Sequence, residues 1–142
     1  MGTPYETDVV AWAHEQAALL RSGNLSAIDA VHIAEEIDDV AKAQRRELKN
    51  RMSVLLAHLL KWKFQPDHRG NSWVSTIRLQ RDEIGDALDE MPSLKHAFDD
   101  ERLLKAIWRN AVTMAQDETR LSFPGTWIWS IEQVLDKDFW PD

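Results

Sequence analysis

The sequence contains no cysteine, so disulfide bonds and thiolate metal ligands are excluded. No apolar run approaches the ~20 residues that a membrane-spanning helix needs, and the first residues lack the basic and apolar regions of a signal peptide. We therefore expect a cytoplasmic protein with no membrane partner. No serine lies in a Gly-x-Ser-x-Gly elbow, and the five glycines are scattered singly. These absences argue against the recognisable hydrolases and nucleotide-binding enzymes, and we expect no cofactor.

Basic residues are outnumbered, with 17 Lys and Arg against 24 Asp and Glu, which gives a formal net charge of −7. This balance argues against strong sequence-independent binding to nucleic acid. Residues 42–51 are nevertheless mostly basic and residues 82–101 mostly acidic. We expect these two blocks to pair within the protein or within a dimer. A length of 142 residues predicts a single domain, residues 1–142, that is large enough to bury a core.

Glycine and proline are absent between Ser26 and Gln65, and this absence predicts a long helix that Pro66 ends. Its apolar stripe follows helical steps: Ile33, Ile37, Val40, Gln44, Leu48, Met52, Leu55, Leu59 and Trp62. If continuous, residues 27–64 would span about 57 Å at about 1.5 Å per residue. Because a compact domain of this size is shorter, we expect a bend near residues 41–46, where the stripe is thinnest, or an end that projects into a partner.

Similar signals predict the other helices. A first helix follows the N-cap Asp8 and stops at Gly23, which suits a left-handed C-terminal position. Serines are the expected caps of the later helices, namely Ser26, Ser72, Ser93 and Ser130. Pro92 ends the third helix, and the fourth is expected to break near residues 99–101. The fold class is all-α, an antiparallel bundle of four main helices with a short C-terminal helix.

Aromatic residues are concentrated in seven tryptophans. The core steps of the helices hold Trp12, Trp62, Trp73 and Trp108, and the C-terminal tail holds Trp127, Trp129 and Trp140. We expect the first four to be buried, and the aromatic tail to fold back onto the bundle. A second interpretation is that the tail packs beside a dimer or partner surface.

Histidine and carboxylate spacing offers weak candidates for a metal site. The chain lacks the two Glu-x-x-His motifs of a di-iron bundle, and Asp29-x-x-His32 is the nearest approach. A single-metal site could still gather His32, Glu35, Glu36 and His58. The simpler interpretation is that His32 lies on a charged surface and His58 packs in the bundle. One of the two glutamates is expected to point inward and meet Arg78 or Arg81 of the next helix.

Arg45, Arg46 and Lys49 are the candidates for nucleic-acid binding, because they lie near one another on a basic helix face. The nearby tryptophans would suit a stacking groove. Their helical spacing favours a role in the core instead, and the net charge has the wrong sign.

Several motifs together resemble one bacterial family. They are the run from Leu55 to Trp62, Gln65-Pro66, Ser72-Trp73 with Thr76-Ile77, Glu35-Glu36-Ile37, Val134-Leu135-Asp136 and Phe139-Trp140-Pro141. Over nearly its whole length the chain is similar to the family catalogued as domain of unknown function 29. The resemblance implies a small helical bacterial protein and brings no activity, cofactor or catalytic residue.

The sequence therefore predicts a non-catalytic interaction or regulatory module with a protein partner or self-association. The alternatives are a nucleic-acid-associated helical protein that uses Arg45, Arg46 and Lys49, and a metal-dependent bundle enzyme that uses His32, Glu35, Glu36 and His58.

Overall fold

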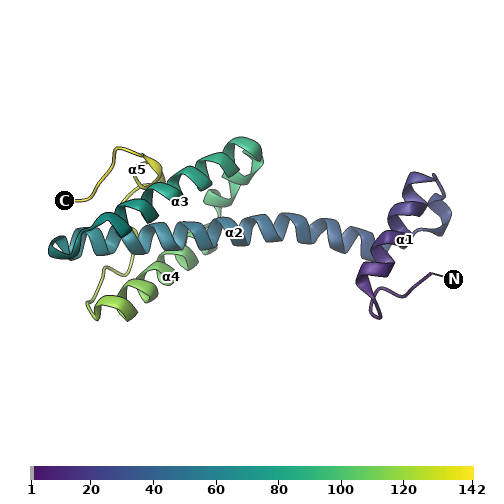
Figure 1. The fold of residues 1–142 in the computed structure, drawn as a ribbon, viewed down its shortest axis with the longest axis horizontal. Helices are drawn as coiled ribbons and strands as arrows, with labels where there is room; N and C mark the ends of the chain where they lie inside the picture. The colour runs from purple at the N-terminus through teal and green to yellow at the C-terminus, as the bar shows by residue number, and fades with distance from the viewer. Residues whose placement is uncertain (1) are drawn as a thin grey trace. The chain divides into compact units, whose positions relative to one another are not determined.

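The computed structural model describes residues 2–142, and within this range it contains helices and no β-strand (Figure 1). The α-helices are α1 (Val9–Arg21), α2 (Ala30–Phe64), α3 (Asn71–Glu90), α4 (Glu101–Thr119) and α5 (Ile131–Leu135). Three 3₁₀ segments connect them: η1 (Leu25–Ala27), η2 (Pro66–His68) and η3 (Pro92–Asp99). The all-α class, with four main helices and a short fifth, is confirmed. No helix among the described residues is long and apolar enough to cross a membrane.

The chain divides into two compact units, Met1–Ala43 and Gln44–Asp142. In the first unit, α1 begins after Asp8, whose side chain accepts a hydrogen bond from the Ala11 amide. The helix ends before Gly23, which has the left-handed φ of 76° that its position predicts. Trp12 is buried and donates from Nε1 to Asp29 at 3.0 Å. The prediction of a single domain over 1–142 stays a prediction.

Helix α2 is one continuous helix from Ala30 to Phe64. Its cap is Asp29, three residues after the expected cap Ser26, and the Asp29 carboxylate accepts a hydrogen bond from the amide of His32. Its end before Pro66 follows the prediction. The helix continues without interruption through residues 41–46. The boundary between the two units, at Ala43 and Gln44, therefore lies inside α2 and not at the end of a helix.

In the second unit, α2 and α4 run in the same direction. Arg45 pairs with Asp100 at 2.9 Å near the start of α4, and Lys61 pairs with Glu118 near its end. Residue numbers therefore increase together along the two helices. Since Asp100 belongs to the acidic block and Arg45 to the basic block, the expected pairing of the two blocks within the protein is also confirmed.

Helix α3 runs antiparallel to α2 (Figure 1). Arg51 donates to Gln80 at 3.3 Å and lies 3.8 Å from Glu83, whereas Lys61, further along α2, lies over the Trp73 ring near the start of α3. The short connections predict such antiparallel neighbours. The expected caps at Ser72 and Ser93 are wrong. Helix α3 begins at Asn71, and the segment after Pro92 is the 3₁₀ helix η3.

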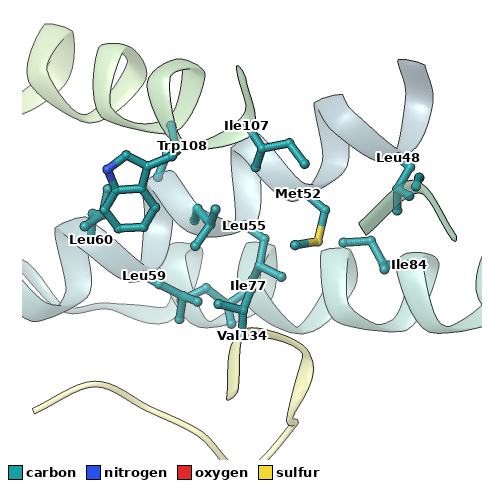
Figure 2. Close-up of a cluster of buried hydrophobic side chains, with 14 of the residues drawn as sticks. Leu48, Met52, Leu55, Leu59, Leu60, Ile77, Ile84, Ile107, Trp108 and Val134 are labelled. Atoms are coloured by element: carbon teal, nitrogen blue, oxygen red, sulfur yellow. The ribbon is translucent and has the colours of Figure 1, made fainter. Parts of the chain in front are cut away.

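The core of the second unit lies where α2, α3, α4 and α5 meet (Figure 2). Figure 2 shows side chains from all four helices pointing toward one another: Leu48, Met52, Leu55, Leu59 and Leu60 from α2, Ile77 and Ile84 from α3, Ile107 and Trp108 from α4, and Val134 from α5. The spacing of these residues predicts most of this set.

The aromatic tail folds back onto the second unit, as expected. Trp140 contacts Trp62 of α2 with ring centroids 4.8 Å apart, and Trp127 lies 5.5 Å from Trp108. The half-buried Trp127 indole donates to the main-chain carbonyl of Leu104 at 2.8 Å, so its N–H has a partner. The capping box predicted at Ser130 is present and begins α5. Trp12 and Trp108 are buried, whereas Trp62 and Trp73 are half-buried.

Candidate functional site

The polar cluster of the first unit surrounds His32. Both imidazole nitrogens face carboxylates, with Nδ1 2.7 Å from Asp29 Oδ2 and Nε2 3.2 Å from Glu6 Oε1. The Tyr5 ring stacks on the imidazole at a centroid distance of 4.3 Å. The hydrogen bond from Asp29 raises the pKa of His32, and the same bond lowers the pKa of Asp29. Charge and geometry therefore favour an imidazolium held between two carboxylates.

Glu36, a metal candidate, has a different contact. Its carboxylate accepts a hydrogen bond from the Tyr5 hydroxyl, and this bond raises the pKa of Tyr5 to about 12. Glu35 is exposed on the neighbouring position of α2. The expected pairing of one of these glutamates with Arg78 or Arg81 is not found among residues 2–142. Glu36 meets Tyr5, and Arg81 contacts main-chain carbonyls.

His58 belongs to the second unit, where it is half-buried on α2. Its Nδ1 lies 2.8 Å from the Val54 carbonyl oxygen, so Nδ1 carries the proton and donates it. Burial lowers the pKa of His58, which favours the neutral ring.

Among residues 2–142, no three His, Cys, Asp or Glu side chains are grouped so that they could hold a metal ion. The metal candidates divide between the two units, with His32, Glu35 and Glu36 in the first and His58 in the second. The single-metal site therefore stays a hypothesis, and the contacts of His32 follow the simpler interpretation of a charged-surface histidine.

The nucleic-acid candidates differ in how accessible they are. The Arg45 guanidinium is bonded to Asp100, Lys49 is half-buried, and Arg46 is exposed. The basic face is thus partly engaged by the second unit's own acidic residues. Binding of nucleic acid at this face stays an alternative to be tested.

Arg81 is buried, as its position on the apolar stripe predicts, with 3% of its surface exposed. Its Nε donates to the Val134 carbonyl at 2.9 Å and its Nη2 to the Phe139 carbonyl at 2.7 Å. The guanidinium lies over the Trp140 ring at 5.5 Å. A single side chain of α3 therefore holds α5 and the tail against the bundle, a role that the sequence did not indicate.

The N-terminal part of the α2 stripe is exposed. Ile37 and Val40 lie on the predicted apolar stripe, yet they are 65% and 63% exposed. Residues 37–43 are all exposed. The sequence signal for this exposure is the thin apolar stripe at residues 41–46. A helix face that packs against its own chain is seldom interrupted by so many charged residues.

These contacts describe a small all-α protein in which an aromatic C-terminal tail packs on the helices of the second unit. The model of the family described as Domain of unknown function DUF29 matches residues 4–140, so the chain belongs to this family. The match confirms the resemblance drawn from the run around Leu55–Trp62. No curated protein and no solved structure matches the chain.

Proposed function

We propose that this protein is a non-catalytic interaction module that associates with a second copy of itself through α2. The observation that supports the proposal most directly is the exposed pair Ile37 and Val40, which extends the apolar stripe of the core beyond the residues that its own chain covers. We define the α2 face as Ile33, Ile37 and Val40. These three side chains follow steps of four and three, the spacing of a helix-pairing seam.

Burial of the α2 face would be favourable. Transfer of apolar surface out of water contributes about 25 cal/mol per Å². Residues 37–43 are exposed on every side of the helix, and short helices without tertiary packing are marginal in water. A partner helix along this segment would cover Ile37 and Val40 and stabilise the helical conformation there.

Charge supports a second copy in the antiparallel orientation. Along α2 the acidic residues Glu35, Glu36, Asp38 and Asp39 precede the basic residues Lys42, Arg45, Arg46 and Lys49. A two-fold axis crossing α2 near Val40 would bring these acidic residues of each copy alongside these basic residues of the other. Parallel pairing would bring like charges together, which is unfavourable.

The absence of cysteine gives a direct test, because one introduced cysteine is the only thiol in each variant. Ala34 and Ala41 are exposed and lie seven residues apart on the same side of α2. In the antiparallel dimer Ala41→Cys lies near the axis and should form a disulfide-linked dimer under mild oxidation. Two copies of Ala34→Cys would be about 20 Å apart at about 1.5 Å per residue, beyond the ~7 Å that a disulfide allows between Cα atoms.

The charges provide a second, independent test. The double variant Lys42→Glu with Arg46→Glu should weaken self-association, and so should Glu35→Lys with Asp39→Lys. In the antiparallel homodimer of either variant, side chains of like charge would lie opposite one another. Mixing the two variants should restore association in a heterodimer. Sedimentation velocity measures all three samples. A monomer for the unaltered chain at high concentration would refute self-association, and efficient linking of Ala34→Cys would refute the antiparallel orientation.

The alternative function makes a different prediction. If the basic block binds nucleic acid through Arg45, Arg46 and Lys49, the fluorescence anisotropy of a labelled oligonucleotide should rise on addition of the protein and fall steeply with salt. The nucleic-acid function would replace the proposal if the chain stays monomeric, binds the oligonucleotide in this way, and loses the binding in the double variant Lys42→Glu with Arg46→Glu.

A further inference from the structure

A small surface cavity of the second unit is lined by three cationic side chains and one carboxylate. Its lining residues are Arg78, Arg81, Asp82 and Lys137, and its volume is about 210 Å³. Arg78 and Lys137 are exposed and form its rim, whereas Arg81 is almost completely buried. The cavity is distinct from the α2 face and uses none of its residues.

The buried guanidinium lacks a full set of partners. Nε and Nη2 of Arg81 donate to the carbonyls of Val134 and Phe139, but the buried Nη1 has no hydrogen-bond partner among the described residues. A buried donor without a partner is costly. Asp136 is near enough to act on Arg81 through space, yet within residues 2–142 the two form no ion pair.

The rim adds further positive charge. Lys137 Nζ lies 2.9 Å from Asp82 Oδ1, so the one carboxylate of the cavity is already paired. The four lining groups carry three positive charges and one negative charge at neutral pH, and Asp136 and Asp86 act on Arg81 and Lys137 from outside the lining. The case for an oxyanion therefore rests on its acceptor oxygens: a tetrahedral oxyanion offers more of them to the three cationic side chains than a monocarboxylate does. Guanidinium groups also suit the geometry of phosphate oxygens.

We propose that this cavity binds a phosphate dianion, with Arg81 at its floor and Arg78 and Lys137 at its rim. The volume admits a phosphate group. Because Arg81 also holds α5 and the tail, an anion at the cavity would stabilise the attachment of the tail to α3. This inference is independent of self-association and would survive its failure.

The test uses the full chain and inorganic phosphate, with chloride at equal ionic strength as the reference. At about a hundred times Kd, phosphate should raise the melting temperature by about 5 °C or more, and isothermal titration calorimetry should show one site per chain. Sulfate, also a dianion, should act similarly, and acetate should act at least about tenfold more weakly. Phosphoserine in place of phosphate tests whether a phosphate ester also fits.

Variants separate binding from folding. Arg78→Gln with Lys137→Gln changes only exposed side chains and should reduce phosphate affinity by at least about tenfold while the chain stays folded. The matched control Lys95→Gln with Arg102→Gln removes the same two charges from other exposed positions and should keep full affinity. No heat and no melting shift with phosphate, or equal losses in the two double variants, would overturn the proposal.

Discussion

The same substitution at two isoleucines tests the difference between the core and the α2 face. Ile77 on α3 has no exposed surface, whereas Ile37 on α2 is 65% exposed. Truncation of a buried isoleucine to alanine costs about 2–5 kcal/mol, because apolar contacts are lost and a cavity remains. For Ile37→Ala in the monomer, we expect a change within about 0.5 kcal/mol, since surface substitutions are nearly neutral and alanine favours helices.

These free energies convert to melting temperatures. For a chain of about this length, 1 kcal/mol corresponds to about 2–4 °C. A loss of about 3 kcal/mol in Ile77→Ala should therefore lower the melting temperature by about 6–12 °C at every protein concentration. Ile37→Ala should match the unaltered chain when dilute and should fall below it only at high concentration, where the dimer contributes.

Circular dichroism melts at a low and at a high protein concentration measure both effects. The concentration dependence is the decisive observation, because burial within the monomer does not depend on concentration. If Ile37→Ala lowers the melting temperature of dilute protein as much as Ile77→Ala does, Ile37 is covered by its own chain and the α2 face is no interface.

Further predictions concern the polar residues and the domain structure. Arg81→Ala should destabilise the chain by at least about 3 kcal/mol, because two main-chain carbonyls lose a charged donor. Arg45→Ala should cost only about 0–1 kcal/mol, since it breaks an exposed ion pair. Equal melting temperatures of the two variants would contradict this ranking. The raised pKa of His32 means that its ion pairs stabilise the folded state below about pH 6.5 and lose this contribution as the pH rises through the folded pKa. The melting temperature of His32→Asn should therefore fall short of the unaltered chain most clearly at pH 5–6 and least at pH 9. Scanning calorimetry should show one transition with equal calorimetric and van 't Hoff enthalpies if residues 1–142 form one domain; two resolved transitions would refute it. Titration with zinc should give no heat of binding, because both nitrogens of His32 face carboxylates and residues 2–142 group no three metal-ligating side chains. A saturable heat lost on substitution of His32 or His58 would revive the metal hypothesis.

Helix ends were predictable where a local rule decides them. Asp8, Gly23 and Pro66 act through their own backbone and nearest neighbours, and each has the role that the sequence predicts. The expected cap at Ser26 failed because a distant contact decides where α2 begins. The Gln16 side chain accepts a hydrogen bond from the Asp29 amide at 2.7 Å, which fixes Asp29 at the start of the helix.

The apolar stripe of α2 shows a different limit. Helical periodicity identifies which face of a helix is apolar, and it does so for Leu55 and for Ile37 alike. What covers that face depends on where the other helices lie. Leu55 has α3 and α4 beside it, whereas Ile37 has no such cover. A core and an interface between chains give the same apolar periodicity in a single sequence. The sequence could therefore place Ile37 on an apolar helix face, but it could not identify what covers that face.

Arg81 shows why the proposed anion cavity was not predictable. Its place on the apolar stripe of α3 indicates that the side chain is buried. For a buried cation, sequence reasoning predicts a carboxylate partner. The structure satisfies most of this need with the carbonyls of Val134 and Phe139. Every residue carries a carbonyl, so no pattern of side chains marks which ones accept. Since carbonyl dipoles solvate a guanidinium but leave its net charge in place, a buried arginine held in this way stays attractive to an anion, and the phosphate titration measures that attraction directly.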